Sequence, residues 1–116
     1  EIIPLELVDS RFYHLDTCFC PLSGGELLYF PAAFDRYGQT AIAERVPDRL
    51  RLAVPEDEAL KFACNAVCVG KHVVLPAGCP TTQAWLRLRG YETHPVQLDE
   101  FMKSGGSAKC LTLALD

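Results

Sequence analysis

The chain has 116 residues, enough for one domain with a single hydrophobic core, and 49% of them are apolar. The formal net charge is −4 and the sequence has no cluster of basic residues, so we expect no nucleic-acid partner. No apolar run approaches the roughly 20 residues that a bilayer-spanning helix needs, and we expect no membrane partner.

The amino-terminal end is typical of a segment cut from a longer protein. The sequence begins at Glu1 without a methionine, and residues 2–8 already have the composition of a strand. No signal peptide is visible at this end. We therefore expect residues 1–116 to be one domain-sized piece of a longer chain.

The sequence contains six cysteines, which could form three disulfides in fifteen different pairings. A chain of this length has enough apolar residues for a core, whereas small disulfide-stapled domains usually have not. The sequence contains no Cys-x-x-Cys motif, so neither a zinc ribbon nor a thioredoxin-type site is indicated. We expect reduced cysteines that act as small core residues, and a cytoplasmic location. They are Cys18, Cys20, Cys64, Cys68, Cys79 and Cys110.

In chain order, residues 12–20 alternate with period two and predict a strand, which a turn at Ser23, Gly24 and Gly25 joins to a second strand at 27–30. Residues 33–45 predict a helix that ends at Val46, because Pro47 disfavours a helical residue before it. A strand at 50–54 follows. Pro55 then opens a surface helix at 55–62, where Glu56, Asp57 and Glu58 suit the positive end.

The same order of elements then repeats at an offset of about 45 to 50 residues. This pattern is typical of a repeated ββαβ unit. We expect Ala84, Trp85 and Leu88 to be the buried stripe of the helix in this second unit. The class is α+β, an α/β propeller of about two units. The later elements are predicted as strands at 65–69 and 72–75, a helix at 80–89, a strand at 96–98, a helical turn at 99–103 and a strand at 110–115.

Cys110 is the first candidate for chemistry. It follows a flexible loop that contains Gly105, Gly106 and Ser107, whose bare backbone can approach a ligand closely. Lys109 is a positive neighbour in sequence, although its side chain should point to the opposite face. A nucleophilic thiol needs access and a lowered pKa. Cys110 is therefore either a nucleophile or a buried cysteine at the start of a core strand.

His14 and Asp16 are the second candidate. If residues 12–20 form a strand, the spacing of two residues places both side chains on one face. His14 would serve as general acid and base, and Asp16 would hold a cationic substrate through paired hydrogen bonds. The alternative is a half-exposed strand with its polar side in water. A metal site that adds Cys18 and Cys20 is disfavoured, because four ligands on one straight strand span too far to enclose one ion.

The remaining polar candidates are read as structural. His72 and His94 look ordinary, with His94 exposed in a polar loop before Pro95. Asn65 either supports the site or ends a strand, and the structural interpretation is preferred. Trp85 is expected in the core.

Two motifs together resemble the guanidino-group-modifying enzymes, which include arginine deiminase, arginine dihydrolase, dimethylarginine dimethylaminohydrolase and the amidinotransferases. The motifs are Tyr-His-Leu-Asp-Thr at 13–17 and Gly-Gly-Ser-Ala-Lys-Cys-Leu-Thr-Leu at 105–113. Asn65 to Val67 and Leu28 to Phe34 extend the resemblance over nearly the whole chain. It implies the C-terminal half of a pentein propeller, built from ββαβ units around a central cavity.

The resemblance also implies residue roles. Cys110 would attack the guanidinium carbon, His14 would protonate the leaving group and then activate water, and Asp16 would grip the guanidinium. No cofactor and no metal are implied. The partner would be a small guanidino substrate such as arginine.

The family takes further carboxylates from an N-terminal half that is absent from this sequence. We therefore expect the chain to be inactive without that half or a second chain, and an exposed cut face makes a homodimer a reasonable expectation. Hydrolysis of arginine or a methylated arginine is the preferred function. An amidinotransferase and a non-enzymatic pentein binding module stay open as alternatives.

Overall fold

The computed structural model describes residues 5–12 and 15–97, which form two small three-stranded sheets with helices beside them. One sheet contains β1 (Phe19–Pro21), β2 (Leu27–Tyr29) and β3 (Arg51–Ala53), and the other contains β4 (Val67–Val69), β5 (His72–Pro76) and β6 (Glu92–Val96). The helices are α1 (Arg36–Arg45), α2 (Glu56–Ala59) and α3 (Pro80–Leu88). No helix in this described part is long and apolar enough to cross a bilayer.

Both sheets have the same topology. The first two strands of each pair antiparallel, and the third is parallel to the second, with Leu28 opposite Leu52 in one sheet and Val73 opposite Thr93 in the other. A parallel pair needs a crossover connection, which α1 and α3 supply. The predicted ββαβ repeat is therefore confirmed.

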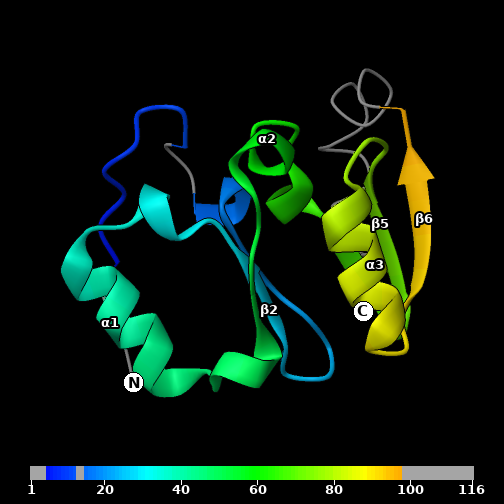
Figure 1. Cartoon of the computed structure of the whole chain (residues 1–116), viewed down its shortest axis with the longest axis horizontal. Coiled ribbons are helices and arrows are strands. Elements are labelled where there is room, and N and C mark those ends of the chain that lie inside the picture. The colour runs from blue at the N-terminus through cyan, green and yellow to red at the C-terminus, as the bar shows by residue number, and fades with distance from the viewer. Residues whose placement is uncertain (1–4, 13–14, 98–116) are drawn as a thin grey trace.

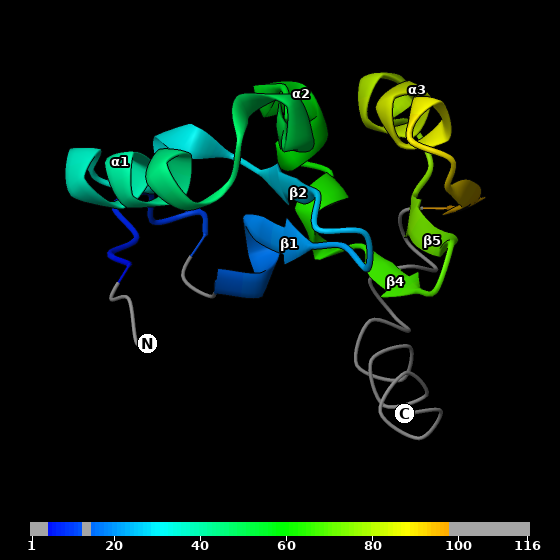
Figure 2. The same ribbon diagram turned by 90° about the horizontal axis from the view of Figure 1, so that it is seen from below.

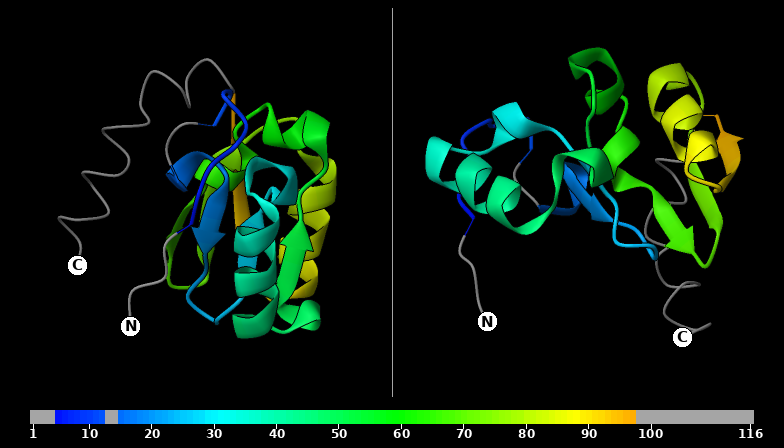
Figure 3. Two further views of the ribbon diagram at one scale, coloured as in Figure 1. Left: turned by 90° about the vertical axis from the view of Figure 1, so that its left-hand side faces the viewer. Right: turned by 60° about the horizontal axis from the view of Figure 1, so that its bottom comes forward.

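The two ββαβ units lie side by side, with α1 and α3 at opposite ends and α2 between them (Figure 1). Figure 2 shows the three helices along one side of the molecule and β1, β4 and β5 along the other. Figure 3 shows the same layering from two more directions. One cluster of buried residues runs through both units, from Phe12 and Phe34 to Leu75 and Leu86.

The predicted strand at 12–20 is wrong over most of its length. Leu15–Thr17 forms a 3₁₀ turn, in which the Cys18 N–H donates to the Leu15 carbonyl at 3.1 Å, and only Phe19–Pro21 is a strand. Phe12 and Cys18, on either side of the turn, both enter the core, at 1% and 0% exposure. Asp16 therefore does not lie in a strand as the i, i+2 argument assumed, and a 3₁₀ turn does not alternate its side chains; His14 lies outside the described residues, so the placement of the pair stays a prediction.

Helix α1 begins three residues later than the predicted Ala33. Pro31–Ala33 forms a separate 3₁₀ turn, and Asp35 caps α1 by accepting a hydrogen bond from the Gly38 N–H at 2.8 Å. A side-chain acceptor at this position satisfies an N–H that has no partner inside the helix. The predicted end is confirmed, since Val46 is already extended.

Helix α2 is shorter than predicted, and the expectation of three surface acids is wrong for Glu58. The helix ends at Ala59, and Phe62 adopts a left-handed conformation with φ of 66° that a continuing helix cannot contain. Glu58 is 2% exposed, and its carboxylate accepts hydrogen bonds from the Thr81 N–H at 2.9 Å, the Thr82 N–H at 2.9 Å and the Thr82 hydroxyl at 2.7 Å. A side chain of α2 thus caps the N-terminus of α3.

The second unit differs from prediction in two details. Thr82 and Leu86 form the buried face of α3, whereas Ala84 is exposed, Leu88 is 86% exposed and Trp85 is only partly buried. The strand predicted at 96–98 is β6 at Glu92–Val96, four residues earlier. Pro95 is tolerated there because β6 is an edge strand of the described sheet and needs no ladder N–H on its outer side. The elements predicted at 99–103 and 110–115 lie outside the described residues.

Replacing Glu58 by alanine tests the helix cap. The variant leaves two N–H groups at the start of α3 without their acceptor, which should lower the free energy of unfolding by about 1–3 kcal/mol in urea denaturation. Asp57→Ala, an exposed acid on the same helix, is the matched control and should change it by less than about 0.5 kcal/mol. An equal effect of both substitutions would contradict the cap.

The same bonds predict a pH dependence. Burial alone raises the pKa of Glu58, but the hydrogen bonds from Thr82 and Thr81 outweigh it, so the pKa lies below its ordinary value of 4.5. A lowered folded pKa stabilises the protein above the unfolded value, and this stability is lost as pH falls through the folded value. The difference in unfolding free energy between the unsubstituted chain and Glu58→Ala should therefore shrink below pH 4.5.

Tyr91→Phe tests the contact between the two units. The Tyr91 hydroxyl donates to Glu26 Oε1 at 2.6 Å and accepts from the Gly24 N–H at 2.9 Å, so it joins the start of β6 to the β1–β2 turn. Because Glu26 is 7% exposed, removing the hydroxyl should cost about 1–3 kcal/mol of unfolding free energy. Tyr37→Phe, at a tyrosine that is 65% exposed, should leave thermal stability unchanged. If Tyr91→Phe is as stable as Tyr37→Phe, the hydrogen bond from the Tyr91 hydroxyl to Glu26 contributes nothing to the stability of the fold.

Candidate functional site

The predicted catalytic residues Cys110 and His14 lie outside the described residues. Asp16 lies on the described backbone of the 3₁₀ turn Leu15–Thr17, and its side chain is outside the described part. Of the three predicted site residues, the structure therefore describes only the backbone of Asp16. The catalytic and binding roles of all three residues stay predictions.

The turn that carries Asp16 packs at the junction of the two ββαβ units. It contacts a second 3₁₀ turn, Ala63–Asn65, which leads into β4. The Cys20 thiol crosses the same junction and donates to the Ala66 carbonyl at 3.5 Å. Cys18 and Cys64 are buried beside it, at 0% and 1% exposure. Apolar packing from both units thus holds the backbone on which Asp16 lies.

Asn65 ends the second of these turns and carries a buried polar atom. Its Oδ1 has no hydrogen-bond partner among the residues that the structure describes. Buried acceptors are normally paired, so this atom is suited to accept an N–H at the junction. The structural interpretation preferred from sequence is not tested by this observation.

Two of the other cysteines are poor nucleophiles. Burial raises the pKa of the Cys64 thiol well above its ordinary value, and the neighbouring thiols of Cys20, Cys18 and Cys79 raise it further. Burial and the charge of Glu58 raise the pKa of Cys79 to about 11. A thiolate is the reactive form of cysteine, so neither residue competes for the role assigned to Cys110.

A small apolar pocket of about 90 Å³ lies against α1. The described residues that line it include no carboxylate, so this lining offers nothing that would hold a guanidinium. The lining residues are Leu5, Phe19, Ala41, Ile42, Arg45 and Val46.

The structure also brings together His72, Glu92 and His94, which sequence reasoning treated as ordinary. Their ligand atoms lie within 4.8 Å of one another on β5 and β6. His94 is exposed as predicted, but it lies in a strand and not in a loop. The spacing of Glu92 and His94 by two residues was the available signal. The part played by His72 depends on strand register, which the sequence does not display.

Three comparisons relate the chain to known proteins. No family model matches it. The bifunctional arginine dihydrolase/ornithine cyclodeaminase ArgZ of Synechocystis is 50% identical over 113 residues, which are 97% of this chain and 16% of that protein. N(G),N(G)-dimethylarginine dimethylaminohydrolase of Mycobacterium tuberculosis is 41% identical over 114 residues, 98% of this chain and 37% of that protein. The chain is homologous to a part of these guanidino-group-modifying enzymes.

A solved structure agrees with this placement. The N-terminal domain of an ArgZ variant, covalently bound to a reaction intermediate, matches the chain with a TM-score of 0.85 and 49% identity. The match covers 96% of this chain and 41% of that one. The fold is therefore part of a pentein propeller, as the resemblance to guanidino-group-modifying enzymes implied.

The predicted position within the enzyme needs a correction. The chain spans between 16% and 37% of the two relatives, and in ArgZ the matching structure is an N-terminal domain. The segment therefore does not correspond to the C-terminal half of a bifunctional protein of the ArgZ kind, whereas its place as the C-terminal half within the propeller stays a prediction. The sequence could not show this, since motifs inside a domain carry no information on what flanks it.

Alkylation tests the assignment of inert cysteines. In the folded chain at mildly alkaline pH, Cys64 and Cys79 should resist iodoacetamide, because burial both blocks access and disfavours their thiolates. Peptide mass spectrometry after timed quenching measures the modification of each cysteine. The control is the same reaction in denaturant, where both should react. Equal rates in the folded and denatured chain would refute the assignment.

Proposed function

We propose that this chain supplies the nucleophile of an enzyme that hydrolyses the guanidinium group of arginine or a methylated arginine. The observation that carries the proposal is 50% identity, over 97% of the chain, to an arginine dihydrolase. Both motifs that resemble this superfamily, at 13–17 and 105–113, fall within a match of that extent.

In the first step, the Cys110 thiolate attacks the guanidinium carbon and a carbon–sulfur bond forms. The bond to the leaving nitrogen breaks as His14 gives that nitrogen a proton, and ammonia or an amine departs. The thiolate can form beside the substrate because the bound cation stabilises its negative charge. The covalent intermediate reported for ArgZ supports a reaction of this kind.

In the second step, neutral His14 takes a proton from water, and the resulting hydroxide adds to the carbon of the amidino-thioether. The carbon–sulfur bond then breaks and Cys110 is regenerated. Asp16 accepts N–H hydrogen bonds from the guanidinium throughout, which holds the flat cation face-on to the sulfur.

Three acids of the described part have other partners. Glu58 caps α3, Glu26 accepts from Tyr91, and Glu56 pairs with Arg11 at 3.1 Å. They are therefore poor candidates for the additional carboxylates that a guanidinium site needs. These carboxylates are expected from residues outside this chain, and for that reason the chain alone is expected to be inactive.

The choice of substrate is less constrained than the reaction. Arginine is preferred over a methylated arginine because identity to the dihydrolase is 50%, against 41% to the dimethylaminohydrolase. The amidinotransferase and binding-module alternatives, the homodimer and the cytoplasmic location stay predictions.

The test compares the chain alone with the chain completed by the remaining part of its propeller. The completed protein should release ammonia from arginine, and acid quenching during turnover should trap an adduct on Cys110 that mass spectrometry detects. Cys110→Ser should lower turnover by a factor on the order of 10³ or more, because a hydroxyl is a far weaker nucleophile at neutral pH.

Cys68→Ser is the matched control and should keep full activity. Turnover by the chain alone would refute the need for outside carboxylates. Undiminished activity of Cys110→Ser would refute the nucleophile itself.

A further inference from the structure

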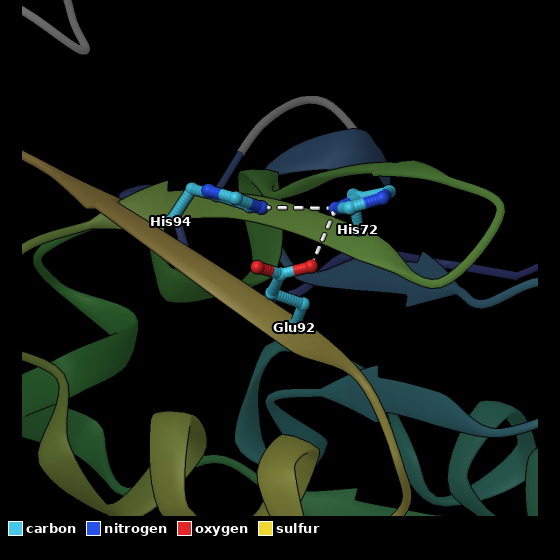
Figure 4. Close-up of side chains that lie close together, drawn as sticks. All are labelled: His72, Glu92 and His94. Carbon is cyan, nitrogen blue, oxygen red and sulfur yellow. Dashed lines mark hydrogen bonds and ion pairs between the residues drawn. The ribbon is translucent and has the colours of Figure 1, made fainter.

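His72, Glu92 and His94 form a cluster on the second sheet that the proposed hydrolysis does not use. His72 Nδ1 lies 3.0 Å from His94 Nε2 and 3.3 Å from Glu92 Oε2 (Figure 4). The side chains of His72 and Glu92 are 57% and 68% exposed, so solvent and ions reach the cluster. We propose that these three residues bind a divalent transition-metal ion of the zinc class.

The distances fit a single ion. Zinc binds imidazole nitrogen and carboxylate oxygen at about 2.0–2.2 Å, so two ligand atoms of one tetrahedral ion lie about 3.3 Å apart. The distances of 3.0 and 3.3 Å from His72 Nδ1 are close to this separation. One ion can therefore contact all three residues with small side-chain movements, and water completes its coordination.

The chemistry of the donors also fits. Two facing imidazole nitrogens at 3.0 Å need a proton between them, since two lone pairs in direct contact repel. A metal ion replaces that proton and accepts both lone pairs. Imidazole and carboxylate together suit zinc, nickel, copper and cobalt, and Glu92 supplies a negative charge to the cation.

The backbone holds the three residues in place. Glu92 lies opposite His72 in the parallel ladder, and His94 lies two residues further along β6 on the same face. The other face is anchored, because Val73 and Leu75 are fully buried and Thr93 accepts hydrogen bonds from Gln83 and Arg87. Rigid elements lower the entropy lost when ligands converge on an ion.

Neighbouring basic side chains are directed to other partners. The Lys71 ammonium lies 4.8 Å from the centre of the Tyr91 ring, the Arg89 guanidinium lies over Trp85, and Arg87 donates to Thr93. Among the described residues, these three cations therefore do not compete with a metal ion for the negative charge of Glu92.

The cluster is separate from the turn that carries Asp16. His72 pairs with Val69 beside the β4–β5 turn, whereas the Ala63–Asn65 turn precedes the opposite end of β4. A metal here would clamp β5 to β6 and would take no part in the attack on a guanidinium. The proposal therefore stands or falls independently of the proposed function.

The experiment titrates the chain with Ni²⁺ and measures the heat of binding by calorimetry. It is done at neutral pH in the presence of a reductant that does not bind metals. One ion per chain should bind, and His72→Gln and His94→Gln should each weaken binding tenfold or more. Glu92→Gln should weaken it less, because the amide oxygen keeps a donor but loses the charge. His14→Gln, which removes the third histidine of the chain, is the matched control and should bind as the unsubstituted chain does.

A second measurement uses Co²⁺ on the unsubstituted chain and needs no variant to fold. The proposal expects paramagnetic broadening of the His72 and His94 imidazole signals, with no thiolate-to-cobalt absorption band. Absence of binding, binding that survives in both His72→Gln and His94→Gln, or a thiolate band in place of the broadening would overturn it.

Discussion

The second ββαβ unit is held against the first by carboxylates that are buried between them. Glu58 reaches from α2 to the first turn of α3, and Glu26 reaches from the β1–β2 turn to Tyr91. A buried carboxylate is unfavourable without partners, so each must keep its hydrogen bonds for the units to stay together. Apolar packing alone tolerates small rotations of one unit against the other, whereas these bonds specify one arrangement. The turn with Asp16 lies at this junction and takes its position from it.

The same constraint explains which parts of the fold were predictable. Order and type of the elements follow from local patterns: Pro47 ends α1, Gly90 with φ of 88° follows α3, and two short apolar runs form each hairpin. Periodicity failed where tertiary contacts decide. Residues 15–17 alternate like a strand but form a 3₁₀ turn that packs on the turn Ala63–Asn65, a contact between distant segments that a local pattern does not contain. Leu88 looks apolar enough for the core, yet Thr82 is buried in its place because its hydroxyl donates to Glu58.

The candidate sites divide in a similar way. Cys110, His14 and Asp16 were proposed from two motifs, from the two-residue spacing of His14 and Asp16 and from a resemblance, and the comparisons bear out the resemblance. The position of the segment in the whole enzyme was not recoverable from those motifs. His72, Glu92 and His94 were missed for a physical reason. Nothing in the sequence says that residue 72 lies opposite residue 92, because register across a parallel pair is set by how the crossover helix packs.

The distribution of thiol reactivity follows from the two roles that cysteine has in this chain. In the core, a thiol is a small apolar group, and burial keeps Cys64 and Cys79 protonated by raising their pKa values. A nucleophile needs the opposite environment, with access to solvent and a nearby positive charge. In a guanidino-modifying enzyme the substrate itself can bring that charge. A cysteine without a permanent cationic partner is then reactive only when the site is occupied, and the buried cysteines stay inert whether or not substrate is bound. On the proposed assignment of the nucleophile to Cys110, the chain would hold several thiols and direct chemistry to one of them.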